Sequence, residues 1–263
     1  MTTSSLTPAG NISLSLAGLN ALVIGGSSNI GEAIAHGFVD AGARVCIASR
    51  TPAKLEAATA RMIARDPRAK GYVADLTRSA DLERLAKEAV TDMGRIDIVL
   101  NCQGITLIKP ALDFTPEDFQ RIIDTNLTSV FFSCTVFGRL MQQAGGGAIV
   151  NIASLAAHRG WPGSTPYAIS KHGVLGLTHS LAAEWAASGV RVNAISPGFF
   201  MTNLNRDQMS PQRKERALDR TPMGRFGEVA ELVGAAVYLA SPGAGFVTGT
   251  VINVDGGYLA AGI

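Results

Sequence analysis

The sequence predicts a single doubly wound α/β domain, a seven-stranded parallel sheet with helices on both faces. Three observations support this prediction. The chain has 263 residues, a length at which one α/β domain is common. Short runs rich in Val and Ile alternate with longer segments of helical periodicity. Hydrophobic residues make up 47% of the chain, with 29 glycines and only 10 phenylalanines, which suits small-residue packing between helices and a buried sheet.

Seven apolar runs are the expected strands. Each is short and bounded by turn or helix signals, as is typical of strands buried on both faces. Ligands of such sheets bind beyond the carboxyl ends of the strands, so functional residues are expected where each run ends. In chain order the runs are ALVIG (21–25), ARVCIAS (43–49), GYVAD (71–75), IDIVLN (96–101), GAIVNIAS (147–154), VRVNAISP (190–197) and TVINVD (250–255).

The segments between these runs carry helix signals. Residues 52–66 and 80–94 are amphipathic, and Gly94 is expected to end the second helix as its C-cap. Gly145–Gly147 predicts a turn before the fifth strand. The polar residues 1–15 are expected to form a flexible N-terminal arm, which leaves 16–263 as the one domain.

Charge and composition exclude several classes of partner. The 23 basic and 21 acidic residues are scattered, so no nucleic-acid partner is expected. The chain has no Lys or Arg before Arg44 and no apolar run near the roughly 18 residues of a membrane span, so a cytoplasmic protein without a membrane partner is expected. Cys46, Cys102 and Cys134 are far apart in apolar segments and form no ligand spacing with the histidines. They predict reduced core thiols and no metal site.

A glycine-rich stretch, GGSSNIG, follows the first strand and opens a helix. Backbone N–H groups at such a helix start, helped by the helix dipole, can bind an anionic pyrophosphate, which predicts a Rossmann-type dinucleotide site. The expected cofactor contacts in this turn are Gly25, Ser27, Ser28, Asn29, Ile30 and Gly31.

Asn29 stands where a third glycine is expected, and two interpretations are open. Its side chain could intrude on the phosphate and weaken cofactor binding. Alternatively, Asn is the best substitute for Gly in a left-handed backbone and a preferred N-cap, with Glu32 completing a capping-box-like pair. We favour the second interpretation because Asn29 and Glu32 lie at the start of an apolar-periodic helix.

The second strand ends at Arg50 and lacks the acid that would hold the adenosine ribose in an NAD site. The planar guanidinium of Arg50 suits the 2′-phosphate of NADP. NADP(H) is therefore the favoured cofactor and NAD(H) the alternative, since Arg50 could also be a solvated residue that opens the next helix.

Tyr167 and Lys171 lie four residues apart, after Thr165 as the expected N-cap and Pro166 at the first helical position. A nearby ammonium stabilises a phenolate, so Lys171 is expected to lower the pKa of Tyr167 and make it a proton donor and acceptor. Ser154 ends the fifth strand, where its hydroxyl could hold a substrate oxygen.

The turn Gly25-x3-Asn29-x-Gly31, joined to Ser154, Tyr167 and Lys171, resembles the short-chain dehydrogenase/reductase family over about residues 18 to 258. The resemblance implies that Asn126 is the fourth catalytic residue and anchors a water that links the lysine to solvent. A mid-helix polar residue satisfied by backbone is the alternative for Asn126. In the family, the lysine also holds the nicotinamide ribose.

The resemblance also implies further cofactor contacts. Two residues after the third strand would contact the adenine, and a segment after the sixth would close over the nicotinamide. The family usually has Asn-Asn-Ala-Gly where this chain has Asn-Cys-Gln-Gly at 101–104, so Gln103 adds an amide to the floor of the cofactor site. The expected contacts outside the glycine turn are Arg50, Asp75, Leu76, Asn101, Gly104, Tyr167, Lys171, Pro197, Gly198 and Thr202.

Residues 199–225 are polar, charged and without strand character, and we interpret them as a mobile substrate lid. Basic lid residues such as Arg213 could meet an acidic carrier protein, but interspersed acids make a solvated helix face equally consistent. The expected substrate pocket consists of Ser154, His158, Trp161, Phe199, Phe200 and Leu204.

The resemblance implies an NAD(P)-dependent oxidoreductase that transfers a hydride between a nicotinamide and a secondary alcohol or ketone, such as a sugar, polyol or other small alcohol. Reduction of a carrier-bound 3-oxoacyl thioester is the alternative within enzymes. A non-catalytic nicotinamide-binding regulator is the alternative from another class, and the complete Ser-Tyr-Lys-Asn set argues against it. The resemblance also implies a homo-oligomer, a homotetramer or a dimer.

Overall fold

The parallel sheet predicted from the seven apolar runs is present in the computed structural model, which describes residues 13–27, 29–202 and 209–261. Its strand order is β3-β2-β1-β4-β5-β6-β7, with every pair parallel. Each observed strand overlaps its predicted run, and most ends differ by one or two residues. The strands are β1 (Asn20–Ile24), β2 (Arg44–Ser49), β3 (Lys70–Val73), β4 (Ile98–Asn101), β5 (Gly147–Ile152), β6 (Val190–Pro197) and β7 (Val251–Val254).

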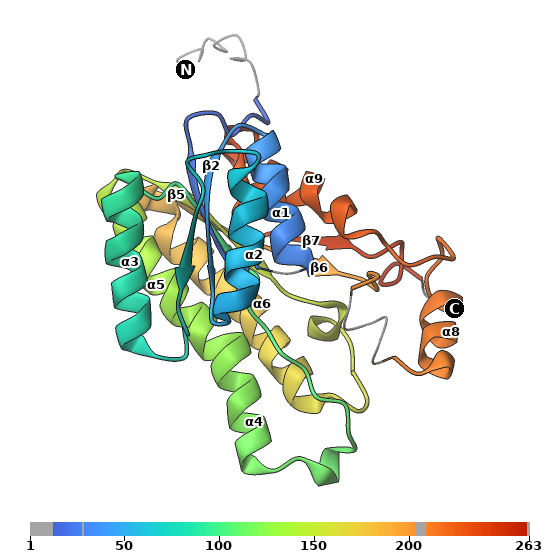
Figure 1. The fold of residues 1–263 in the computed structure, drawn as a ribbon. Coiled ribbons are helices and arrows are strands. Elements are labelled where there is room, and N and C mark those ends of the chain that lie inside the picture. The colour runs from blue at the N-terminus through green and yellow to red at the C-terminus, as the bar shows by residue number, and fades with distance from the viewer. Residues whose placement is uncertain (1–12, 28, 203–208, 262–263) are drawn as a thin grey trace, which may run out of the picture.

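Helices cover both faces of this sheet (Figure 1). One layer contains α1, α2 and α9, and the other contains α3, α5 and α6. The predicted end of α3 at Gly94 is confirmed, because Gly94 has a φ of 79° and donates its N–H to Val90 O. The helices are α1 (Asn29–Asp40), α2 (Pro52–Ile63), α3 (Ser79–Met93), α4 (Pro116–Ile123), α5 (Ser129–Gln143), α6 (Thr165–Trp185), α8 (Pro211–Asp219) and α9 (Val233–Ala240).

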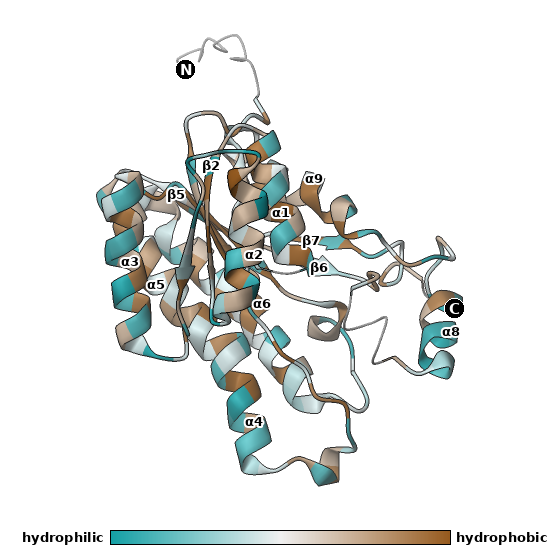
Figure 2. Cartoon of the chain, in the orientation of Figure 1, coloured by the Kyte–Doolittle hydropathy of each residue, from teal (hydrophilic) through white to brown (hydrophobic). Residues whose placement is uncertain are grey.

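The hydrophobic core is split in two by the sheet. Successive side chains of a strand point to opposite faces, so Leu22 packs in the core under α3 and α5, whereas its neighbour Val23 packs in the core under α1 and α9. Both side chains are fully buried. Figure 2 shows hydrophilic and hydrophobic residues mixed on α2, α3 and α4, as surface helices require. No helix in the described ranges is long and apolar enough to cross a membrane.

The expected N-terminal arm falls mostly on residues 1–12, which lie outside the described residues. Ser13 already accepts a hydrogen bond from Gly243 N, and Leu16 is fully buried. Residues 13–15 thus already contact the domain, and the arm proposed for the residues before them stays a prediction.

Candidate active site

A cavity of about 520 Å³ opens at the carboxyl ends of β1 to β6. It includes the point between β1 and β4 where the strand order reverses, which is where ligands of open α/β sheets bind. Ser28 and Leu204 lie outside the described residues. The predicted site residues that line the cavity are Gly25, Ser27, Asn29, Ile30, Arg50, Asp75, Leu76, Gly104, Ser154, Trp161, Tyr167, Lys171, Pro197, Gly198, Phe199, Phe200 and Thr202.

The glycine turn between β1 and α1 is closely packed against other backbone. Gly25 has a φ of 79°, and a Cβ there would lie 2.9 Å from the carbonyl carbon of Cys102. Gly31 is buried beneath the cavity wall, and a Cβ there would lie 2.2 Å from Gly25 O. No side chain fits at either position, so the turn presents backbone to the cavity, as a phosphate site requires.

Asn29 has a φ of 50° and is the only non-glycine residue with positive φ in the described part of the chain. The left-handed half of the favoured interpretation is therefore confirmed. The predicted capping role of Asn29 is not confirmed, because α1 begins at Asn29 itself. The carboxylate of Glu32, the expected partner in the capping box, accepts a hydrogen bond of 2.6 Å from Arg61 Nε. Glu32 thus ties α1 to α2.

The adenosine side of the cavity carries two cations. Arg50 is exposed at the end of β2, and Lys54 follows one helical turn later in α2. Neither forms an ion pair with another described residue. Lys54 was missed from the sequence, although it lies in the first turn of the helix that follows Arg50, beside the end of β2.

The residues after β4 divide between the cavity and the core. Asn101 is 1% exposed, and its amide contacts Asn151 Oδ1 at 2.9 Å and accepts from Ser133 Oγ at 2.7 Å. The Asn101 side chain therefore belongs to a buried polar network, and a contact between Asn101 and the cofactor stays a prediction. Gln103 lies in the wall, and its Nε2 donates to Ser129 Oγ at 3.3 Å. Cys102 also lies in the wall, and burial raises its pKa to about 11.

Ser154, Tyr167 and Lys171, three of the four predicted catalytic residues, line this cavity. A side-chain interaction with Ser154 lowers the pKa of Tyr167. Ser154 Oγ accepts from Ala156 N at 3.2 Å, which leaves its one proton for another acceptor. Lys171 Nζ lies 5.9 Å from the centre of the Tyr167 ring and donates to Ile152 O at 2.7 Å. The expected shared face is confirmed, although α6 begins one residue earlier than predicted, with Ser164 as its N-cap.

The expected lowering of the Tyr167 pKa is not found. Burial raises the pKa of Tyr167 above its usual value, and the hydrogen bond with Ser154 only partly offsets this effect. Lys171 is 4% exposed, and burial lowers its pKa to about 8. Desolvation is therefore the largest effect on both residues, and it acts against their charged forms.

Asn126 lies in a π-helical turn, Asp124–Thr128, and is fully buried. Its Oδ1 accepts from Ile105 N at 2.7 Å, and its Nδ2 donates to Ile105 O at 2.8 Å. A Cβ on Gly104 would lie 3.5 Å from Asn126 Oδ1 and 3.7 Å from Lys171 Nζ, so both groups flank the same backbone. Asn126 Nδ2 also donates to Ser170 Oγ at 3.1 Å, so its partners include a side chain as well as backbone. Its role in a proton relay stays a prediction.

Aromatic rings line the cavity at the end of β6. The Trp161 and Phe199 rings are stacked with centres 5.7 Å apart, and Tyr258 lies 5.6 Å from Phe199. His158 is absent from the described cavity wall and pairs instead with Ser196 at 2.8 Å from Nε2 to Oγ. The short turn Leu155–Ala157 leads into His158, and a contact between His158 and the substrate stays a prediction.

The segment predicted as a lid contains α8, which Ser210 caps by accepting from Arg213 N. Met209 and Arg213 reach the cavity wall. The Arg213 side chain is half-buried and forms no ion pair with any other described residue. Whether this segment moves as a lid stays a prediction.

The cavity fits a nicotinamide dinucleotide. The bare backbone at Gly25 and Gly31 suits a pyrophosphate, and the two cations at Arg50 and Lys54 suit a further phosphate. On the other side of β4, Tyr167 and Lys171 line the same cavity.

Known proteins resemble the chain over nearly its full length. A family model described as Enoyl-(Acyl carrier protein) reductase matches residues 25–259. D-threitol dehydrogenase of Mycolicibacterium smegmatis is 37% identical, with 92% of this chain and 94% of the relative covered. A 3-oxoacyl-(acyl-carrier-protein) reductase of Haemophilus influenzae is 36% identical, with coverage of 90% and 96%.

A solved structure also superposes on the chain. The gluconate 5-dehydrogenase of Burkholderia cenocepacia in complex with NADP and tartrate has a TM-score of 0.90 at 35% identity, and the match covers 95% of this chain and 98% of that one. The seven-stranded parallel sheet agrees with these matches. The chain therefore belongs to the short-chain dehydrogenase/reductase family, as an NAD(P)-dependent oxidoreductase of secondary alcohols and ketones.

Proposed function

We propose that Ser154, Tyr167 and Lys171 catalyse reversible hydride transfer between NADP(H) and a small polyhydroxylated alcohol, a sugar acid or polyol. The observation that carries this proposal is that Ser154, Tyr167 and Lys171 share the cavity wall, with Lys171 Nζ 5.9 Å from the centre of the Tyr167 ring. The relatives named for threitol and gluconate support the substrate class.

The residues have distinct roles. The bound nicotinamide supplies or accepts the hydride. In reduction, the Tyr167 hydroxyl donates its proton to the substrate carbonyl oxygen, and in oxidation the phenolate takes that proton back. Ser154 orients the substrate oxygen, and the Lys171 ammonium stabilises the phenolate. Asn126 supports the proton relay by fixing the Ile105 backbone beside Lys171.

Arg50 is the basis for proposing NADP(H) over NAD(H). Arg50→Asp is expected to lower the ratio of kcat/KM for NADP to that for NAD by about 10²-fold, because a charge-assisted contact to the 2′-phosphate is lost and repulsion replaces it. Steady-state kinetics with both cofactors measure this ratio. Lys87→Asp makes the same charge change on exposed α3, outside the cavity wall, and serves as the control. An unchanged ratio in Arg50→Asp would show that another group reads the phosphate.

A substrate panel tests the reaction class. Polyols, aldonates and 3-oxoacyl thioesters are each assayed by the absorbance of the reduced nicotinamide, and turnover of the first two groups is expected. The H. influenzae relative and the cationic Arg213 in the wall favour thioester reduction as the second candidate. No turnover on the whole panel, together with tight cofactor binding, would favour a non-catalytic regulator instead.

We also propose a cytoplasmic homo-oligomer, a tetramer or a dimer. Phe131 and Phe132 on α5 and Ile169 on α6 are 42%, 50% and 46% exposed, an apolar surface that a second copy could cover. The free thiols of Cys46 and Cys134 suit a reducing compartment. Light scattering on the purified protein measures the oligomeric state.

A further inference from the structure

Strand β3 is the edge of the sheet, and it leads directly to the adenosine side of the cavity. It pairs with β2, and the described part of the chain places no strand on its outer side. Asp75, Leu76 and Thr77, which follow β3, all line the cavity. The position of this loop therefore depends on the contacts that fix the carboxyl end of β3.

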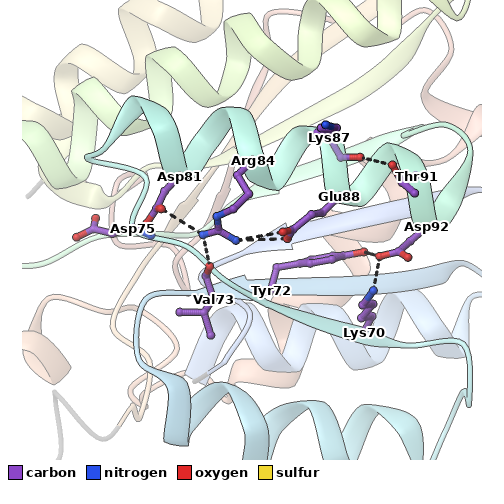
Figure 3. Close-up of polar contacts among 10 residues, drawn as sticks. All are labelled: Lys70, Tyr72, Val73, Asp75, Asp81, Arg84, Lys87, Glu88, Thr91 and Asp92. Atoms are coloured by element: carbon purple, nitrogen blue, oxygen red, sulfur yellow. Dashed lines mark hydrogen bonds and ion pairs between the residues drawn. The ribbon is translucent and has the colours of Figure 1, made fainter.

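Two side chains of α3 hold that end (Figure 3). Arg84 Nη2 donates to Val73 O at 2.8 Å, and Asp81 Oδ2 accepts from Asp75 N at 3.0 Å. Between these two bonds, Ala74 N donates inward to Ser49 O of β2 at 3.1 Å. The backbone that enters the loop is thus fixed from both sides, by β2 and by α3.

The two α3 side chains also fix each other. Arg84 Nη2 lies 3.2 Å from Asp81 Oδ1, so each Asp81 oxygen has its own partner. Glu88 approaches the other arm of the same guanidinium at 3.4 Å. The Asp75 N–H and the Arg84 guanidinium together hold the pKa of Asp81 below its usual value. At neutral pH the carboxylate therefore stays charged and remains a strong acceptor.

We propose that Asp81 and Arg84 are positioning residues for the adenosine half of the dinucleotide. Neither belongs to the described cavity wall, so they act through the Asp75–Leu76 backbone. The inference rests on the proposed placement of the adenosine against this loop. In Asp81→Asn, Asp75 N and the Arg84 guanidinium must share one neutral amide oxygen in place of the two carboxylate oxygens. The loop is then held less firmly and must be ordered at the moment the cofactor binds, which weakens binding.

The same strand provides a matched control at its other end. Asp92 of α3 contacts Lys70 Nζ at 2.6 Å and accepts from the Tyr72 hydroxyl at 2.6 Å (Figure 3). This carboxylate also joins α3 to β3, but at the start of the strand, away from the loop. Asp92→Asn and Asp81→Asn therefore remove the same charge from the same helix, and only Asp81→Asn affects the loop.

Calorimetric titration of the full chain with ADP-ribose and with nicotinamide mononucleotide tests the proposal, since the two probes report on the two halves of the cofactor. Asp81→Asn is expected to weaken ADP-ribose binding about five- to tenfold and to leave nicotinamide mononucleotide binding unchanged. Arg84→Met is expected to show a smaller loss of the same kind. Asp92→Asn is expected to lower the melting temperature without changing the affinity for either probe.

Equal ADP-ribose affinities in wild type and Asp81→Asn would overturn the proposal. An equal loss in Asp81→Asn and Asp92→Asn, or an equal loss for both probes, would also overturn it, because either would show a general loss of structure. If the wild-type chain binds neither NADP(H) nor NAD(H), the proposed function fails instead. The failure of the inference is therefore distinguishable from the failure of the function.

Discussion

Tyr167→Phe is expected to lower kcat by about 10³-fold while leaving the affinity for NADPH within about twofold of wild type. The substitution removes the one hydroxyl that the structure places beside Ser154 in the cavity, and it keeps the ring that packs near Lys171. The substitution should therefore slow the chemical step without changing cofactor binding. Single-turnover kinetics measure the first, and quenching of protein fluorescence by NADPH measures the second.

Ser154→Ala supplies the control for this interpretation. Its hydrogen bond lowers the pKa of Tyr167 against the effect of burial, so its loss raises that pKa further. Alcohol oxidation needs the phenolate and becomes faster as the pH rises. The oxidation profile of Ser154→Ala should therefore move to higher pH than that of wild type. Normal turnover in Tyr167→Phe would assign the proton transfer to a different group.

The sheet could be predicted from sequence because its strands are buried on both faces. Each apolar run is bounded by a turn or a helix start, and β6 (Val190–Pro197) matches its predicted run at both ends. Strand ends were less predictable where the chain leaves the sheet gradually. Ser154, for instance, was expected to end β5, but the strand stops at Ile152 and Ser154 caps the short turn that follows.

The site was predictable where residue type and backbone position determine the role. Tyr167 and Lys171 meet because four residues make about one helical turn. The directions of side chains at loop ends were not predictable, because neighbours distant in sequence determine them. Asn151 holds Asn101 in the core, and Ser196 holds His158 outside the cavity. The prediction that the pKa of Tyr167 is lowered was wrong for a related reason. The pKa depends on how deeply the side chain is buried, and burial follows from packing that no short motif specifies.

Lys171→Met is the second large effect, with kcat expected to fall by about 10²-fold because the phenolate loses its stabilising charge. The same substitution also changes how stability depends on pH. Burial lowers the pKa of Lys171 to about 8, whereas an unfolded chain returns it to about 10.4. Between these values the unfolded chain keeps a proton that the folded chain has released. Wild-type stability therefore rises with pH in this window, and the variant lacks this contribution.

Urea unfolding of the cofactor-free protein at pH 7.0 and pH 9.5 measures this contribution. The difference in unfolding free energy between wild type and Lys171→Met should move in favour of wild type by about 2 kcal/mol between the two pH values. Other titrating groups are common to both proteins and cancel in this difference. The lost hydrogen bond to Ile152 O lowers the stability of the variant equally at both pH values, so it also cancels. A difference that does not change with pH would mean that Lys171 titrates as an exposed lysine, and the tight burial that raises the pKa of Tyr167 would then have to be reconsidered as well.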